Sequence, residues 1–180
     1  ASVDAGERGD HGRAGVLARR VGLLDERTVG EFPDAAIARA WLGVTTGDAE
    51  LIQRSLLQAG RSDRGRPLSD GTPSVKVAAA LVSSLVGVYG VQDVLRQAEV
   101  VRGAGEHLVN RWWGAATVMM GAAQAMIGNT AAARMSLESA LPVIGDLPGF
   151  HAAALAHLAL LDFGDGDDEG GLTRSAQARS

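Results

Sequence analysis

The feature that most constrains this chain is a step of 38 residues between glycine pairs. Gly90-Val91, Gly128-Asn129 and Gly166-Asp167 follow one another at this step, and each pair separates two apolar stretches with helical spacing. Gly47-Asp48 does the same 43 residues before Gly90. A period of this length is typical of helical-hairpin repeats, in which one unit cannot bury its apolar face alone. We therefore expect an all-α array of about four helical hairpins.

Apolar residues at intervals of three and four predict the helices of these hairpins. The predicted ranges are 34–46, 48–59, 74–89, 91–103, 111–127, 130–145, 149–163 and 168–178. Asp34 follows a proline and is expected to cap the first of them, and Thr72-Pro73 is expected to start the third. Residues 60–73 are polar and rich in Gly, Pro and Arg, so this loop accounts for the longer first step.

Small residues recur seven positions before each turn glycine, at Ala40, Ser83, Gly121 and Ala159. Small side chains let the two helices of a hairpin approach closely, where a larger side chain would overpack the contact. The array is expected to occupy residues 13–180 as one domain, with the polar residues 1–12 as a disordered or cut N-terminus.

Composition bounds the classes of function. Hydrophobic residues make up 46% of the chain and charged residues 21%, with a net charge of −4. This balance argues against non-specific nucleic-acid binding, which needs clustered Lys and Arg. The absence of cysteine excludes disulfides and cysteine-bound metals, and favours a cytoplasmic location. No apolar run approaches the ~18 residues of a membrane span.

Catalytic and cofactor motifs are missing. The single lysine, Lys76, does not follow a phosphate-binding glycine loop, and Gly103-Ala-Gly105 lacks the third glycine of a dinucleotide fingerprint. His151 and His157 are six residues apart, which places them on different helix faces rather than at the i, i+4 spacing of a zinc pair. We therefore predict a protein that is not an enzyme and carries no cofactor or metal.

Two charged segments have ordinary structural interpretations. The acidic run 165–170 resembles half of a calcium loop, but position twelve is Ala176 where a bidentate Glu is required. It is interpreted as an acidic turn before a helix. Arg61, Arg64 and Arg66 form a small basic cluster, interpreted as part of a solvated loop because nucleic-acid footprints are broader.

Three segments carry a family resemblance. They are FPDAAIARAWLGVTTGDAELIQRSLLQAG (32–60), WWGAATVMMGAAQAMIGNTAAARMSLESALPV (112–143) and HAAALAHLALLDFGDGDDEGG (151–171). Together they resemble the tetratricopeptide-like region of large LuxR-type bacterial transcriptional regulators related to the maltose-regulon activator. The resemblance implies a right-handed superhelix that senses an inducer or a partner protein. The nucleotide-binding and DNA-binding modules of that family have no counterpart within this sequence, so neither activity is transferred.

Aromatic residues supply the candidate binding site. Aromatic residues make up only 4% of the chain, yet it contains three tryptophans, of which Trp112 and Trp113 are adjacent and cannot both face one core. One is expected to pack and the other to lie on a rim. In the tetratricopeptide-like register, an apolar concave groove would be lined by Ile37, Trp41, Val118, Leu160 and Phe163.

Such a groove suits a small-molecule inducer or an amphipathic partner helix. The leading expectation is a sensing and protein-interaction domain of a LuxR-type regulator, with self-association as a further outcome and no direct contact with nucleic acid or membrane. The alternative is a general binding or oligomerisation scaffold from another multidomain protein. In that alternative the tryptophans are core residues and partners dock on the convex side.

Overall fold

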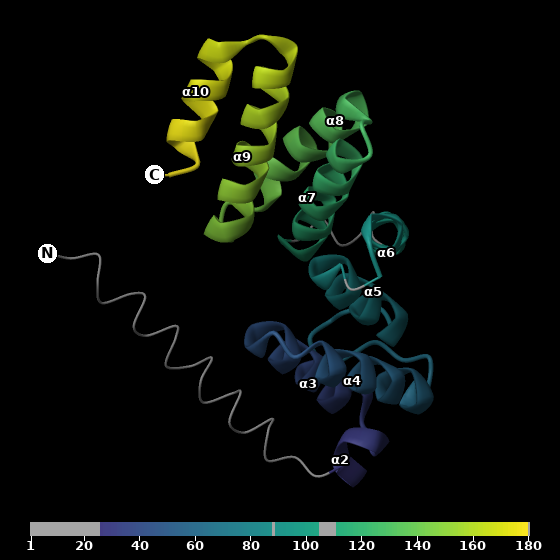
Figure 1. Cartoon of the computed structure of the whole chain (residues 1–180). Helices are drawn as coiled ribbons and strands as arrows, with labels where there is room; N and C mark the ends of the chain where they lie inside the picture. Colours follow the sequence, from purple (N-terminus) through teal and green to yellow (C-terminus); the bar gives the residue numbers. More distant parts are fainter. Residues whose placement is uncertain (1–25, 88, 105–110, 180) are drawn as a thin grey trace, which may run out of the picture. The chain divides into compact units, whose positions relative to one another are not determined.

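A computed structural model describes residues 26–87, 89–104 and 111–179, and in these ranges it contains helices and no strands (Figure 1). The helices are α2 (Glu26–Glu31), α3 (Pro33–Thr46), α4 (Ala49–Ser62), α5 (Val75–Val86), α6 (Val91–Gly103), α7 (Arg111–Met126), α8 (Thr130–Ala140), α9 (Pro148–Asp165) and α10 (Asp168–Gln177), with a short 3₁₀ helix, Leu141–Val143, after α8. The predicted all-α class is confirmed. The expectation for the tail 1–12 lies outside the described residues.

The predicted helices correspond to α3 through α10, with ends that differ by at most three residues apart from the 130–145 range. That range divides into α8 and the 3₁₀ helix. Pro142 is the second residue of the 3₁₀ helix, and a proline cannot donate the backbone hydrogen bond that would continue α8. Helix α2 was not predicted, because a six-residue helix is too short to show a periodic pattern. Val29 anchors it, with no exposed surface.

The contacts divide the chain into two compact units, Ala1–Val82 and Ser83–Ser180. The first contains the α3–α4 hairpin and the second contains the α7–α8 and α9–α10 hairpins (Figure 1). The single-domain expectation for residues 13–180 stays a prediction.

Three hairpin turns are built in the same way. Gly47, Gly128 and Gly166 have φ values of 70°, 80° and 82°, which an L side chain rarely adopts. The N–H of the next residue, Asp48, Asn129 or Asp167, donates to a carbonyl five residues back at 2.9 Å. The side chain of that same residue accepts a hydrogen bond from the N–H three positions on. One residue thus closes one helix and caps the next, an arrangement called here the fused turn.

The turn before α6 differs from this pattern. Gly87, with φ of 60°, follows the end of α5, and Gly90 is the N-cap of α6 without any side-chain hydrogen bond. The interpretation of Gly90-Val91 as a turn equivalent to the other three is therefore wrong in detail. Val91 has no side-chain oxygen, so the second half of the fused turn cannot form there.

Two predicted helix starts are also corrected. Phe32 is the N-cap of α3 and Pro33 occupies the first turn, so Asp34 does not cap the helix. Helix α5 begins at Val75 rather than at Thr72-Pro73, and the Ser74 hydroxyl accepts a hydrogen bond from the N–H of Val77 at 3.3 Å. A serine cap competes well with a proline start, since it satisfies a helix N–H that would otherwise lack a partner.

Asp34 instead fixes the loop between α4 and α5. Its carboxylate accepts hydrogen bonds from the hydroxyl and the N–H of Ser69, at 2.5 and 2.7 Å. These two bonds hold the pKa of Asp34 below its usual 3.8, because they stabilise the charged form. Leu68, beside Ser69, is 6% exposed and belongs to the core of the first unit.

Small residues control the approach of the helices, as predicted. Ala40, Gly121 and Ala159 are buried, whereas the fourth predicted residue, Ser83, is half-buried. A Cβ built on Gly121 of α7 would lie 2.6 Å from Cγ of Leu137 on α8. Gly43 of α3 plays the corresponding part in the first unit, where a Cβ would lie 2.6 Å from Cγ1 of Ile52 on α4. These contacts leave no room for a side chain.

Candidate binding surfaces

Two of the predicted groove residues are core residues. Ile37 is 5% exposed and belongs to the core of the first unit, with Val29, Ala59 and Leu68. Val118 is 1% exposed and packs in the core of the second unit with Leu137 and other apolar side chains. Their assignment to a ligand-contacting groove is corrected, because a ligand cannot reach them without opening the core. The predicted register of these two helices is displaced, so it assigns side chains of the core to the surface.

The three tryptophans are all partly exposed. Trp41 packs against the core of the first unit and stays half-buried. On α7, Trp112 and Trp113 are both half-buried, and the guanidinium of Arg102 lies 6.0 Å from the centre of the Trp113 ring. Each of these side chains therefore offers some surface to solvent while the rest of the ring packs.

The two predicted residues on α9 behave differently from each other. Leu160 is 65% exposed. Phe163 is 38% exposed, and its ring lies against Gly171 of α10, where a Cβ would come within 2.6 Å of Cδ1. Phe163 thus helps to join the two helices of its own hairpin.

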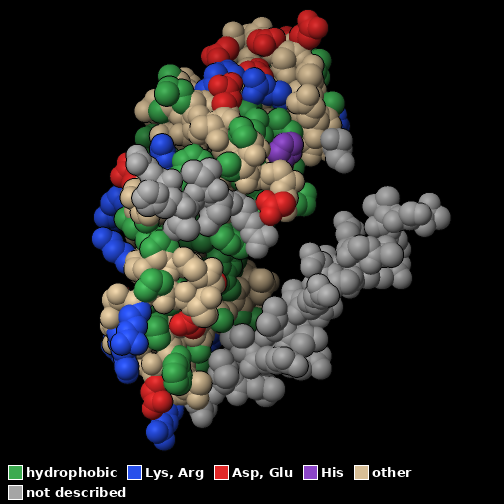
Figure 2. Space-filling model, turned by 180° about the vertical axis from the view of Figure 1, so that it is seen from behind, with side chains coloured by type: hydrophobic (Ala, Val, Ile, Leu, Met, Phe, Trp, Pro, Cys, Tyr) green, Lys and Arg blue, Asp and Glu red, His purple; other side chains and the backbone are tan. Residues whose placement is uncertain are grey.

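A hollow of about 280 Å³ lies on the α3–α4 hairpin. Its charged lining consists of Arg39 from α3 and of Arg54 and Arg61 from α4, with Ser55, Gln58 and two leucines completing it. None of the described residues that line it is acidic. We call it the arginine hollow. Figure 2 shows Lys and Arg side chains along one edge of the first unit.

A second, wider hollow of about 630 Å³ lies on α8, α9 and α10. Leu141 and Leu155 supply apolar surface, while Glu138, Asp167 and Glu169 supply carboxylates. Arg174 lines it too. We call it the acidic hollow. Acidic side chains also crowd the end of this unit where α9 turns into α10 (Figure 2).

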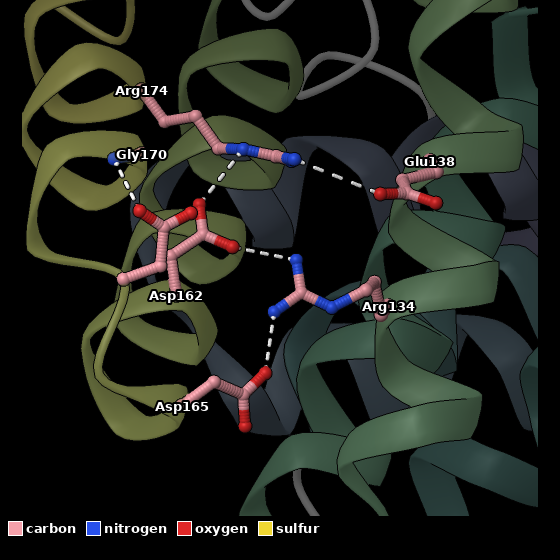
Figure 3. A network of polar contacts seen from close by, with 7 residues as sticks. Arg134, Glu138, Asp162, Asp165, Gly170 and Arg174 are labelled. Carbon is pink, nitrogen blue, oxygen red and sulfur yellow. Dashed lines mark hydrogen bonds and ion pairs between the residues drawn. The ribbon is translucent and has the colours of Figure 1, made fainter.

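Arg174 of the acidic hollow belongs to a charge network around one buried carboxylate (Figure 3). At its centre is Asp162 of α9, whose side chain is 5% exposed. Arg134 of α8 donates to Asp162 Oδ1 at 2.6 Å and to Asp165 at 2.9 Å. Arg174 Nε lies 2.9 Å from Asp162 Oδ2, and its other end lies 3.7 Å from Glu138 of α8. The hydrogen bond with Asp162 raises the pKa of Arg134.

The network ties three helices to one carboxylate. Because Asp162 is nearly inaccessible, its charge requires both guanidiniums, and each of these has a second, more exposed acidic partner. The ion pairs with Asp162 and Glu138 therefore hold the Arg174 side chain in place, so it has little freedom to turn toward a ligand.

Sequence reasoning missed the arginine hollow. It treated Arg61 as one of a loop cluster with Arg64 and Arg66, whereas Arg61 lies in the last turn of α4. The available signal was the spacing of Arg54, Gln58 and Arg61, which places them on one face of a helix.

Comparison with known proteins adds no assignment: no family model, no curated protein and no solved structure matches the chain. Among the described residues, no helix has both the length and the apolar character to cross a membrane. In the same residues, no three His, Asp or Glu side chains come together in a group that could hold a metal ion.

Proposed function

We propose that this chain is a non-catalytic binding module made of tetratricopeptide-like helical hairpins. The observation that carries the proposal is the fused turn, repeated with one geometry at Gly47-Asp48, Gly128-Asn129 and Gly166-Asp167. Repetition of one supersecondary unit is the mark of repeat proteins, whose extended surfaces serve recognition. The tetratricopeptide-like superhelix itself is part of the proposal.

Within this class, the resemblance of residues 32–60, 112–143 and 151–171 to LuxR-type regulators favours a sensing module in a bacterial cytoplasmic regulator. Its ligand would be an inducer or a partner protein. The full reading frame that contains this sequence tests the family assignment directly, through the modules that it encodes on either side of the array. A nucleotide-binding module before the array and a helix-turn-helix domain after it would support it, and their absence would contradict it.

The partly exposed tryptophans are the proposed ligand contacts, Trp41 within the first unit and Trp112 and Trp113 within the second. Trp41, Trp112 and Trp113 combine a packed ring with exposed surface, as aromatic anchors in binding sites do. A fluorescence titration with candidate sugars, lipids and peptides tests this. Truncation of an anchor is expected to weaken binding by about 2 kcal/mol or more.

Trp41→Ala and Trp112→Ala are the informative variants for this titration, and Tyr89→Ala is the control because Tyr89 is 66% exposed. Circular dichroism first establishes that each variant is folded. Equal affinity of a confirmed ligand for all three variants and the parent would remove these tryptophans from the proposed site.

A scaffold that self-associates is the second candidate. The second unit exposes large apolar side chains at Met126, Ile127, Met135, Leu160 and Leu172, with 68%, 47%, 73%, 65% and 65% of their surface accessible. Apolar surface of this kind is typical of interaction sites when it is contiguous. Sedimentation at several concentrations tests this candidate: concentration-dependent dimers without ligand would support it, and a monomer at every concentration would contradict it.

A further inference from the structure

Helix α10 has a covered side and a free side. Helix α8, which holds the same place in the preceding hairpin, packs against both α7 and α9. Among the described helices α10 packs mainly against α9, and it forms the outer edge of the α9–α10 hairpin in Figure 1. Leu172 lies in the middle of α10 and is 65% exposed. The free side of a surface helix is normally polar, so a leucine there calls for an explanation.

The 38-residue step shows which side of α10 carries Leu172. One step earlier stands Arg134 of α8. Arg134 reaches across to the next helix, α9, where it donates to Asp162 at 2.6 Å. The position of Leu172 in the repeat is therefore one that faces the following helix.

Helix α9 shows the same relation to α7. One step before Ala156 and Leu160 stand Val118 and Ala122, which are both buried. Val118 shares its core with residues of α9, so this side of α7 is covered by the next hairpin. Ala156 and Leu160 are exposed. We call the side of α9 and α10 that carries Ala156, Leu160 and Leu172 the end face.

Charge orders the part of the end face that belongs to α10. Asp168, Leu172, Ser175 and Arg179 follow one another at intervals of four, three and four residues, so they share one helix face. The last turn reaches Arg179, whose N–H donates to the carbonyl of Ala176 at 3.2 Å. Asp168 and Arg179 are exposed, and neither forms an ion pair within the described part of the chain. The face thus runs from a negative end through an apolar centre to a positive end.

We propose that the end face pairs with the end face of a second copy of this chain, with the two α10 helices antiparallel about a two-fold axis. In this arrangement Asp168 of each copy lies opposite Arg179 of the other, so two equivalent ion pairs form. Between them, Leu172 of each copy packs against Ser175 and Ala176 of the other. These small side chains let the two helices approach closely.

Charge complementarity is the reason for a second copy rather than a different partner. A face of one sign would fit a partner of the opposite sign, whereas a face with one sign at each end fits its own reversed copy. A parallel arrangement would place like charges together at both ends, so charge also sets the orientation. The inference rests on the second candidate function, a scaffold that self-associates, and it specifies the face and the orientation.

Sedimentation velocity over a wide range of concentrations measures the dissociation constant of the dimer. Asp168→Arg and Arg179→Asp each place like charges opposite one another at both ends of the paired helices, and each should raise the dissociation constant about tenfold. An equimolar mixture of these two variants is the decisive sample. It should associate about as tightly as the parent, because each substituted residue then lies opposite a charge of the other sign.

Glu169→Arg is the matched control for Asp168→Arg. Glu169 is the next residue, is also exposed, and lines the acidic hollow rather than the end face. Its substitution changes the net charge by the same amount and should alter the dissociation constant less than about twofold, since a charge outside the interface acts through a screened field. Equal weakening by both variants, or a mixture that does not recover, would overturn the proposal.

Leu172→Glu tests the apolar centre of the interface. A carboxylate there would be buried between two helices, so the dimer should be lost at concentrations at which the parent dimerises. Met135→Glu is its control, because Met135 of α8 is 73% exposed and stands one step before Thr173, which is not part of the end face. This control should dimerise like the parent. Circular dichroism first establishes that each variant is folded.

Two further outcomes separate this proposal from the function on which it rests. A dimer that no substitution on the end face weakens would overturn the proposal and leave the self-associating scaffold standing. A parent that is monomeric at every concentration would overturn both, and would leave the end face to a helix of another protein.

Discussion

The α3–α4 and α9–α10 hairpins have the same fused turn and use their arginines in opposite ways. In α9–α10, Arg174 is joined by Arg134 of the preceding hairpin around the buried Asp162. In α3–α4, Arg39, Arg54 and Arg61 surround a hollow that contains no acidic side chain among its described lining. The fused turn that forms the hairpin therefore does not determine which charged side chains lie on the surface of its helices.

This difference shows how a repeat can keep its architecture and change the side chains on its surface. The fused turn needs only a glycine followed by Asp or Asn, and the packing needs a small residue between the helices. The remaining helix positions can then either join the helices, as in the charge network, or line a surface hollow, as in the arginine hollow.

The largest expected effect comes from removing the cations of the charge network. Arg134→Met combined with Arg174→Met leaves the Asp162 side chain, which is 5% exposed, without a cation. Loss of both partners should lower the free energy of unfolding by about 3–5 kcal/mol. Urea denaturation measures it.

The matched change in the other hairpin is Arg54→Met combined with Arg61→Met. Because these arginines neutralise no buried charge, the free energy of unfolding should change by less than about 0.5 kcal/mol. If both double variants are destabilised alike, the arginines of the two hairpins have the same role and the comparison fails.

Close packing of two helices is the next largest effect, and the α7–α8 hairpin tests it. Gly121→Leu would place side-chain atoms in the volume occupied by Leu137, since even a Cβ would lie 2.6 Å from it, and should destabilise by about 1–3 kcal/mol. Thermal unfolding measures the change. Gly164→Leu on α9 is the control, because nothing lies within 4 Å of its Cβ position, and it should stabilise slightly through helix propensity. A parental midpoint for Gly121→Leu would show that α7 and α8 do not approach as described.

The fused turns should contribute less, and equally in the two hairpins. Asp48→Ala and Asp167→Ala each remove a side-chain acceptor for the first turn of α4 or α10, and each should cost about 1 kcal/mol. Asp168→Ala, one residue after the cap, should cost only a few tenths because it leaves the cap intact. Chemical denaturation compares the three. A large difference between the first two variants would mean that the turns are not equivalent.

The smallest expected effect is a pH dependence confined to the first unit. The pKa of Asp34 is lower in the folded chain than its ordinary 3.8, because the charged carboxylate accepts two hydrogen bonds from Ser69. The unfolded chain therefore binds a proton more readily, so this stabilisation is complete above pH 3.8 and is lost as the pH falls through the lower folded value. Denaturation of the parent and of Asp34→Asn between about pH 5 and about pH 2 measures it. Parallel pH profiles would contradict the role of Asp34.

The sequence was sufficient to predict most helices, three turns and the small residue at Gly121, because these depend on local backbone chemistry and on periodicity. It was insufficient for the surfaces. Ile37 and Val118 were assigned to a groove and are buried, since a displacement of one position on a helix turns a side chain by about 100°. The arginine hollow depends on Arg39 approaching Arg54 and Arg61 across two helices, and the Asp162 network joins residues 28 apart. Neither arrangement has a local pattern.

The fused turn has a consequence for how such a chain changes length during evolution. Because Asp48 serves the end of α3 and the start of α4 at once, no residue between these helices is free, and one inserted there would separate the two functions. Insertions and deletions should therefore collect in connections between hairpins, such as the exposed residues 63–67 before the buried Leu68. A protease should also cut there before it cuts at Gly47, since the fused turn offers no extended stretch of backbone to an enzyme's active site.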